Sequence, residues 1–173
     1  MGLDMYLSRN MYVSDDQRRS LKITKFKSKL RLDKVRFIIE EVGYWRKANA
    51  IHNWFVNYVQ AGNDDCKEYY VSEEDLQKLL KTVNKVLESS ELVDGDIANG
   101  YHFENGEKTP IIEKGKYIKD PSVAKELLPT TEGFFFGSTD YNQYYYEDLV
   151  STKKILEEAL ANDEGDYMYQ SSW

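Results

Sequence analysis

Cysteine is almost absent from this chain of 173 residues, which has a single thiol at Cys66. One cysteine excludes an internal disulfide. Long apolar runs are also missing: no stretch approaches the roughly 18 apolar residues of a membrane span, so we expect no membrane partner. Residues 1–10 lack a basic stretch followed by an apolar core, so they do not have the pattern of a secretory signal. These absences predict an intracellular, cytoplasmic protein.

The familiar sequence signatures of catalysis are missing as well. There is no phosphate-binding P-loop, no GxGxxG, no GxSxG and no HExxH. The two histidines, His52 and His102, and Cys66 show no metal-ligand spacing, so we expect no metal site and no cofactor. Nothing in the sequence supports a nucleophile pair of Cys66 with either histidine, whereas acid–base work by His52 with Glu40 or Glu41 stays open. We therefore expect a binding protein rather than an enzyme.

Positive charge is scarce overall and concentrated in one segment. The net charge is −7, yet residues 17–36 hold nine Lys or Arg and one acid, Asp33. An acidic chain argues against general nucleic-acid binding, which depends on broad positive fields. Residues 24–32 alternate, which predicts a strand whose one face carries Lys25, Lys27, Lys29 and Arg31. This face suits either an acidic ligand or the acidic groups of the chain itself.

The chain is rich in aromatic residues and has clear apolar periodicity, both typical of a folded globule. Aromatic residues make up 14% of it, including fourteen tyrosines, and a disordered chain would be poor in them. Leu3, Met5 and Leu7 alternate with polar residues, which predicts a strand over 2–8. Residues 9–20 have the polar composition of a loop. Further strands are expected over 35–45, 133–137 and 166–173.

Three helices are predicted from apolar residues at helical spacing. They cover about residues 44–60, a segment beginning at the capping residue Ser72, and a segment from Thr139 or Asp140 to about Ala161. Residues 92–120, rich in Gly, Asp and Asn, predict a surface hairpin with its turn at Asn105–Gly106. The sequence thus predicts an α+β fold: one compact domain, residues 1–173, with a mostly antiparallel sheet packed against about three helices.

The stretch GYWRKANAIHNWF, residues 43–55, gathers the most binding chemistry in the chain. Packing explains much of it, since a lone histidine on an apolar arc is more often a hydrogen-bonded core residue than a catalyst. The polar face is harder to explain by packing, because asparagine recurs there at spacings of four and costs roughly 0.5 kcal/mol in helix propensity against alanine. Amides suit nucleobase edges, ribose hydroxyls and peptide groups, and arginine holds phosphate bidentately. The candidate ligand-binding residues are Tyr44, Trp45, Arg46, Lys47, Asn49, His52 and Asn53. A plain solvated or partner-facing surface is the alternative.

Residues 134–146, FFFGSTDYNQYYY, form a second aromatic cluster, in which seven of thirteen residues are aromatic. The phenylalanines suit a core, but four tyrosines at 141 and 144–146 cannot all face inward on one helix. Tyrosine provides large contact area with little lost rotamer freedom, so it is favoured in binding surfaces. Residues 137–139 precede a predicted helix N-terminus, where backbone N–H groups can hold an anion, although any capped helix has this feature. Tyr141, Tyr144 and Tyr145 join the candidate ligand-binding residues.

Four blocks of the sequence resemble a small protein family found in bacteriophages, prophages and bacterial genomes. They are MGLDMYL at 1–7, EVGYWRKANAIHNWFV at 41–56, LLPTTEGFFFGSTDYNQYYYEDL at 127–149 and YQSSW at 169–173. The resemblance is weak over 9–36 and 92–120 and implies no particular activity. It does imply an accessory role for a phage or mobile element, in the cytoplasm of a bacterial host cell. Small accessory proteins of this kind often act by binding, by analogy alone.

The leading hypothesis is a phage-type accessory binding protein, acting in counter-defence or host modulation, that binds or sequesters a nucleotide-like small ligand. Tyr44, Trp45 or a tyrosine of 141–146 would stack on the base, and Arg46 and Lys47 would meet phosphates. The first alternative is a protein–protein inhibitor of a host or defence enzyme, acting through an acidic, tyrosine-rich surface. Two more are a nucleotide hydrolase or transferase using His52 with Glu41, and a structural module without a small ligand. Exposed tyrosines are also consistent with a homo-oligomer.

Overall fold

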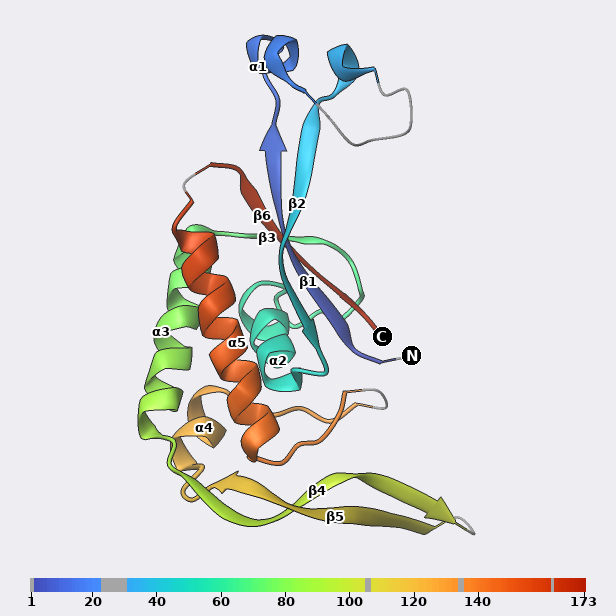
Figure 1. Ribbon diagram of the computed structural model, residues 1–173, viewed down its shortest axis with the longest axis vertical. Coiled ribbons are helices and arrows are strands. Elements are labelled where there is room, and N and C mark those ends of the chain that lie inside the picture. The colour runs from blue at the N-terminus through green and yellow to red at the C-terminus, as the bar shows by residue number, and fades with distance from the viewer. Residues whose placement is uncertain (1, 23–30, 105–106, 134–135, 163) are drawn as a thin grey trace.

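The central sheet is built from both ends of the chain. Strand β1 (Asp4–Tyr12) lies between β2 (Phe37–Arg46) and β6 (Asp166–Ser172), and β3 (Tyr69–Val71) completes the antiparallel order β2-β1-β6-β3. The two ends of the chain therefore lie side by side (Figure 1). The predicted α+β class is confirmed. The computed structural model describes residues 2–22, 31–104, 107–133, 136–162 and 164–173.

The three longer helices, residues 49–58, 73–89 and 143–160, gather against one face of this sheet, and a separate two-stranded hairpin projects at the far end of the molecule (Figure 1). The hairpin consists of β4 (Leu92–Glu104) and β5 (Glu107–Ile118). The helical elements are α1 (Asp15–Ser20), the 3-10 turn η1 (Leu32–Lys34), α2 (Asn49–Tyr58), α3 (Glu73–Ser89), α4 (Ser122–Leu127) and α5 (Gln143–Leu160).

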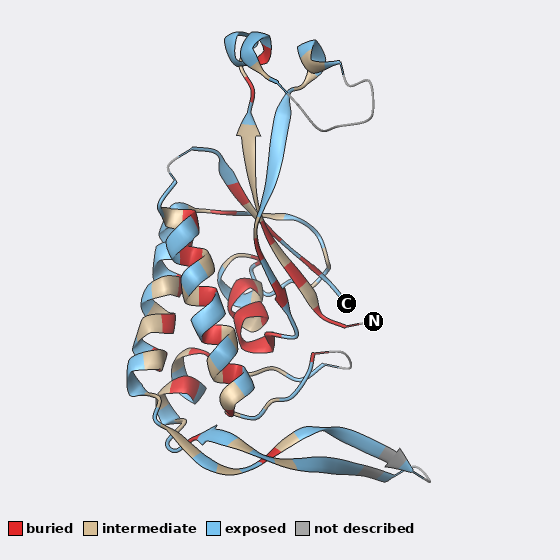
Figure 2. Cartoon of the chain, viewed as in Figure 1, coloured by how far each residue is buried: buried red, intermediate tan, exposed pale blue. Residues whose placement is uncertain are grey.

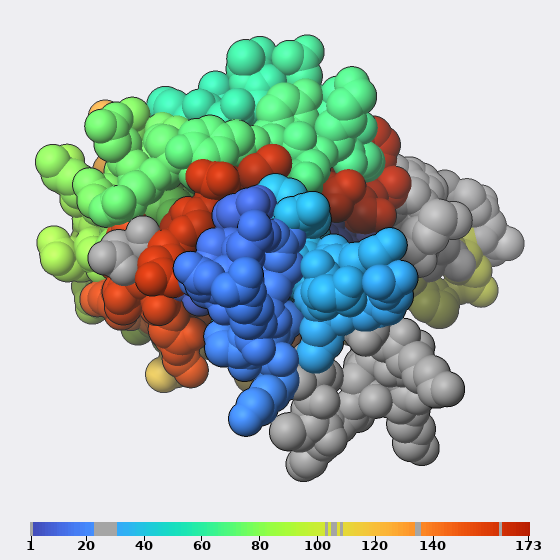
Figure 3. All heavy atoms as spheres, turned by 90° about the horizontal axis from the view of Figure 1, so that it is seen from above, coloured from blue at the N-terminus to red at the C-terminus, as the bar shows by residue number. Residues whose placement is uncertain are grey.

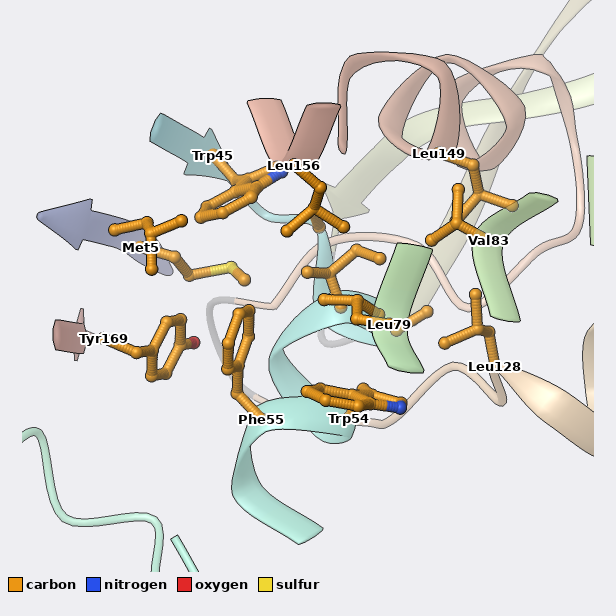
Figure 4. Packing of buried hydrophobic residues seen from close by; sticks show 14 of the residues in the cluster. Met5, Trp45, Trp54, Phe55, Leu79, Val83, Leu128, Leu149, Leu156 and Tyr169 are labelled. Atoms are coloured by element: carbon orange, nitrogen blue, oxygen red, sulfur yellow. The ribbon is translucent and has the colours of Figure 1, made fainter. Parts of the chain in front are cut away.

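The core forms where the inner face of the sheet meets α2, α3 and α5. Leu3, Met5 and Leu7 are fully buried, as their alternation predicts. On the neighbouring strand and on α2, Tyr169 and Phe55 stack with ring centroids 3.9 Å apart. Figure 4 shows these two rings side by side toward one end of the cluster, near Met5, with Val83, Leu128 and Leu149 at the other end. The buried residues thus run continuously from the sheet into the helices (Figure 2).

Helices α3 and α5 lie against each other and run in opposite directions (Figure 1). The cap predicted for α3 is confirmed, since Ser72 accepts a hydrogen bond from the backbone N–H of Asp75 at 3.1 Å. The buried residues of α3 recur at helical spacing: Leu76, Leu79, Val83 and Val86. Those of α5 do the same: Tyr145, Leu149, Thr152, Leu156 and Ala159.

Three sequence predictions about element boundaries are wrong. Residues 9–20 are not a loop, because β1 continues to Tyr12 and α1 follows, capped by a reciprocal pair of hydrogen bonds between Ser14 and Gln17. The three helices predicted correspond to α2, α3 and α5, and the short helices α1 and α4 accompany them. The first long helix begins at Asn49 rather than Tyr44, since residues 44–46 still belong to β2. The last begins after the cap Asn142, not at Thr139 or Asp140.

Two further predictions fall partly on residues outside the part of the chain that the structure describes. The basic strand 24–32 lies mostly there, and its described end, Arg31 and Leu32, forms the start of η1 instead. The predicted strand 133–137 has its centre, residues 134–135, outside the description. Its described residues, Gly133, Phe136 and Gly137, have no strand structure. Phe136 is nevertheless buried, as predicted for the phenylalanines of this segment.

Candidate functional site

A cavity of about 630 Å³ lies where the two predicted clusters meet. Its walls come from the end of β2 and the start of α2 (residues 46–51), the loop 130–142, the first two turns of α5, and residues 98–101 of β4. Ligand pockets for small molecules have volumes of roughly 300–1,000 Å³, so this one is large enough for a nucleotide. Of the ten candidate residues, the structure brings Arg46, Lys47, Asn49, Tyr144 and Tyr145 to this cavity.

Two cations, Arg46 and Lys47, stand exposed at the wall formed by the β2–α2 connection. Within the described residues neither has an acidic partner at ion-pair distance. Lys47 has a φ of 62°, in the left-handed region that costs a non-glycine residue about 1 kcal/mol or more. Its backbone is fixed there by hydrogen bonds from its own N–H to Leu3 O (2.7 Å) and from Asn49 N–H to its carbonyl (2.8 Å). The fold therefore holds two cations beside the cavity that form no ion pair with any described residue.

Asn49 shapes the cavity by fastening the loop that covers it. Its Nδ2 donates to the carbonyls of Phe136 (3.0 Å) and Ser138 (2.7 Å), and its Oδ1 accepts from Thr131 N–H (3.2 Å). The side chain is buried, although the helix pattern placed it on the solvent face. Its carboxamide is committed to the loop, so we assign it a positioning role.

The N-terminus of α5 is closed by Asn142. The Oδ1 atom of Asn142 accepts from the N–H groups of Tyr144 (2.9 Å) and Tyr145 (3.4 Å), so the helix itself offers few free donors to an anion. The other end of this carboxamide differs: Nδ2 is buried and has no hydrogen-bond partner among the described residues. Buried donors normally have a partner, and Asn142 lines the cavity. The cavity wall thus contains one unsatisfied donor.

The candidate aromatic rings divide into one that is open to the cavity and several that are not. Tyr144 is 38% exposed, lines the cavity, and donates from its hydroxyl to Glu113 of β5 at 2.7 Å. Tyr145 touches the cavity but is buried, with its hydroxyl bonded to the carbonyl of Leu128 (3.0 Å). Tyr141 packs on Tyr145 and accepts from Thr130 N–H (3.2 Å). Among the candidate rings, Tyr144 is therefore the one available for stacking.

Trp45 and Tyr44 lie away from the cavity, on opposite faces of β2. Trp45 is buried under α5, where its indole N–H donates to Thr152 at 2.8 Å. Tyr44 is on the outer face of the sheet, where it contacts Tyr6 and donates to Asp4. Neither ring lines the cavity.

Asp148 adds a titratable group to the wall formed by α5. Burial raises the pKa of its carboxyl to about 7, and the neighbouring negative charge of Glu147 acts in the same direction. The cavity therefore gains negative charge as the pH rises through neutrality. Deprotonated Asp148 would repel an anionic ligand, whereas the protonated form can donate a hydrogen bond.

Asp148→Asn is expected to stabilise the protein at alkaline pH. A carboxyl whose folded pKa is raised stabilises the native state only while protonated, so the wild type loses stability between the unfolded value near pH 4 and about pH 7. One pKa unit corresponds to about 1.4 kcal/mol, and partial exposure reduces the effect. We expect Asp148→Asn to exceed wild type by ~2 kcal/mol at pH 8.5 and to match it at pH 3.5, measured by urea unfolding. The control is Asp94→Asn, on the exposed side of β4. Equal differences at both pH values would contradict the assignment.

His52 and Asn53 line a second, smaller cavity of about 380 Å³ on the other side of the 130–138 loop. His52 is only 1% exposed, and both ring nitrogens have partners: Tyr169 Oη at 2.8 Å from Nδ1, and Asp64 Oδ2 at 3.0 Å from Nε2. Burial keeps the pKa of Tyr169 well above its ordinary value, so its hydroxyl stays protonated and can donate to Nδ1. Trp173 donates to the second oxygen of Asp64 (3.0 Å). Of the two interpretations of His52, the geometry favours a hydrogen-bonded core residue over a catalyst. Its acidic partner is Asp64 rather than Glu41.

Asn53 also has an internal role, since its Nδ2 donates to the carbonyl of Pro129 (3.1 Å). Both Asn49 and Asn53 therefore bind the backbone of the segment that precedes α5. The amide face of α2 serves largely to fasten this segment to the helix.

Sequence reasoning missed several groups that line the cavity: Asn99, Tyr101, Asn142 and Asp148. For the first two, the Asn99–Gly100 pair is a sequence signal of a break in the strand. The structure has such a break there, since Gly100 has a φ of 92° and the strand register shifts between Ala98 and Tyr101. The adjacent acids Glu147 and Asp148, facing a cavity with two cations, are a second signal. Neither signal says which part of the chain the hairpin approaches.

Comparison with known proteins gives no match: no family model, curated protein or solved structure is similar to this chain. Across the described part of the chain, no three His, Cys, Asp or Glu side chains are grouped as a metal ion would require. Likewise, none of the helices described is long and apolar enough to cross a membrane.

Proposed function

We propose that this protein binds a nucleotide-like small ligand in the cavity between α2, α5 and residues 98–101 of the β4–β5 hairpin. In the cytoplasm of a bacterial host it would act as a phage-type accessory protein that sequesters this ligand in counter-defence or host modulation. The observation that carries the proposal is the convergence of residues 46–49 and 137–148 on one cavity, beside two cations that have no acidic partner at ion-pair distance in the described part of the chain. The resemblance to phage and prophage proteins supports the biological setting only.

The side chains that line the cavity match the three parts of a nucleotide: phosphate, base and ribose. Arg46 and Lys47 supply positive charge for phosphate oxygens, and Arg can bind them bidentately. Tyr144 offers a partly exposed ring for stacking on a base. Asp148 accepts hydrogen bonds from ribose hydroxyls when ionised, and the unpartnered Nδ2 of Asn142 is a donor for a base or ribose oxygen.

Native mass spectrometry tests this proposal, followed by titration calorimetry. The protein purified from bacteria is compared with its denatured mass and then mixed with linear and cyclic nucleotides and ADP-ribose derivatives. A stoichiometric added mass of a few hundred daltons is the expected result. Arg46→Gln and Lys47→Gln should each weaken binding about 10- to 100-fold, since a hydrogen bond to a charged group contributes roughly 1.5–3 kcal/mol. Lys81→Gln, an exposed cation on α3, is the matched control.

The outcomes separate the competing functions. Unchanged affinity in both cavity variants would place the ligand elsewhere. A spectrum free of added mass across the whole panel contradicts a nucleotide pocket. Released product of altered mass would instead indicate a hydrolase or transferase.

A protein target is the second candidate, favoured by the exposed apolar side chains of the hairpin. Ile111, Ile112 and Tyr117 of β5 are 49%, 56% and 42% exposed, on an element that projects from the body of the molecule (Figure 1). Exposed apolar groups gathered on one element are typical of interaction surfaces. In this case the partner is a host or defence protein, which a pull-down from infected cells would recover with the wild type and lose with Ile112→Asp.

A further inference from the structure

The outer half of β2 is an exposed apolar edge. Phe37, Ile38 and Ile39 are 59%, 38% and 67% exposed, and Tyr12, which contacts Phe37, is 59% exposed. Strand β2 ends the sheet order, and β6 pairs with β1 only as far as Asn10. The outer parts of β1 and β2 therefore form a two-stranded ribbon that projects beyond α3 and α5 and carries α1 and η1 at its end (Figures 1 and 2). We call this ribbon, with α1 and η1, the arm.

Such an edge is unusual in a soluble protein. Two-stranded ribbons are marginally stable in water, and exposed edges are normally protected by lysines, prolines, bulges or covering segments. The only irregularity in the pairing of β1 with β2 lies nearer the body of the sheet, between Leu7 and Ser8. Seen from above, the arm points at the viewer, with α1 and the segment of η1 and β2 side by side at its end (Figure 3). The edge is thus presented away from the helical core.

The hydrogen-bond pattern shows which backbone groups this edge offers. Val13 N–H donates to Arg36 O at 2.9 Å, and Val13 lies opposite Arg36 in the register. The backbone N–H and C=O groups of successive residues in a strand point to opposite sides. Arg36, Ile38 and Glu40 therefore direct these groups at β1, while Phe37 and Ile39 direct theirs away from it. An added antiparallel strand must therefore form its hydrogen-bonded pairs with Phe37 and Ile39.

The sequence of the edge is complementary to itself. It reads Arg36-Phe37-Ile38-Ile39-Glu40, with a base at one end, an acid at the other and apolar residues between. In an antiparallel pair centred on Ile38, Phe37 of each copy forms a hydrogen-bonded pair with Ile39 of the other, as the backbone pattern requires. The same register places Arg36 opposite Glu40 twice. Centring on Ile39 instead would place Phe37 opposite Glu41 and Ile38 opposite Glu40.

We propose that two copies of this chain pair through their β2 edges, antiparallel, about a two-fold axis at Ile38. The pairing joins the two four-stranded sheets into one continuous sheet and brings the apolar side chains of the two arms into contact across the new strand pair. Arg36 has no acidic partner among the described residues of its own chain, whereas Glu40 is held by Arg9 at 2.5 Å. In the dimer Glu40 lies between Arg9 and Arg36 of the partner subunit, so the partner's cation completes the pair.

Light scattering after size exclusion tests the association, and a charge reversal tests its chemistry. We expect about twice the chain mass of 20.3 kDa at tens of micromolar protein. Arg36→Glu places like charges opposite each other at both ends of the pair, so we expect a dissociation constant at least tenfold higher. Lys81→Glu makes the same charge change on α3 and should leave the dimer intact. A monomer mass for the wild type overturns the proposal, as does a dimer that Arg36→Glu does not weaken.

Disulfide trapping tests the register. In a Cys66→Ser background, Ile38→Cys places two thiols opposite each other at a position that is not hydrogen-bonded, where Cα atoms lie about 4.5 Å apart. A disulfide spans Cα distances of about 4.4–6.8 Å, so oxidation should give a covalent dimer. Ile39→Cys is the matched control. In this register Ile39 lies opposite Phe37 of the partner subunit, so the two introduced thiols are offset by two residues and little cross-linking is expected. Cross-linking of Ile39→Cys in preference to Ile38→Cys would overturn the register.

Discussion

Replacing His52 with alanine is expected to lower the free energy of unfolding by about 3 kcal/mol. The change opens a cavity beneath α2, and truncation of large buried side chains costs about 2–5 kcal/mol. It also leaves the buried hydroxyl of Tyr169 without its partner, which adds a desolvation penalty of about 1–3 kcal/mol where water cannot reach it. Urea unfolding monitored by tryptophan fluorescence measures the loss.

The chain supplies its own control for this substitution. His102 is the other histidine, lies exposed on β4, and is 4.0 Å from Glu104. We expect His102→Ala to change stability by less than about 0.5 kcal/mol, as for surface substitutions in general. If His52→Ala kept wild-type stability but abolished a turnover of nucleotides, His52 would be a catalyst rather than a part of the core.

Asn49→Ala is expected to cost about 3 kcal/mol and to abolish binding in the cavity. The substitution removes three hydrogen bonds at once, each worth about 1 kcal/mol, and leaves backbone groups of Thr131, Phe136 and Ser138 without partners. Freed from α2, the loop would no longer hold the wall that faces Arg46 and Lys47. Calorimetry with whichever nucleotide binds the wild type, together with urea unfolding, measures both effects.

Asn57→Ala is the matched control, since Asn57 occupies the same helix two turns later and bonds only to Asn53 of its own helix. Its expected effect is below about 0.5 kcal/mol, with unchanged ligand affinity. Equal effects of the two substitutions would mean that the loop is fastened by something other than Asn49.

Local patterns predicted the parts of the fold that depend on neighbouring residues. The alternation of Leu3, Met5 and Leu7 gave the inner face of β1, and Ser72 gave the start of α3. The start of α2 could not be read this way, because the break between strand and helix depends on a left-handed Lys47, and lysine carries no local preference for that conformation. The bonds from its N–H to Leu3 and from Asn49 to its carbonyl hold that backbone, and the first joins residues that are far apart in the sequence, at the start of β1 and the end of β2.

The candidate site was predictable in its chemistry but not in its assembly. Arg46, Lys47 and Tyr144 were singled out as residue types that bind anions and bases, and they do line one cavity. The helix pattern placed Asn49 in solvent, because periodicity describes one helix and says nothing of a loop from residue 130 onward that lies over it. Asp148 was overlooked, since its raised pKa depends on burial that only the folded chain provides.

The position of β1 between β2 and β6 has a consequence for how this chain folds. Among the described elements β1 is synthesised first and β6 last, yet they pair from Asp4 with Ser172 to Asn10 with Asp166. Contacts between segments so distant in the chain slow folding, because a long loop must close before they form. In the native sheet β6 occupies the edge of β1 that faces away from β2, so this edge has no partner strand before β6 pairs. Unpaired strand edges favour aggregation during folding, and the late synthesis of β6 lengthens the time for which this edge is open.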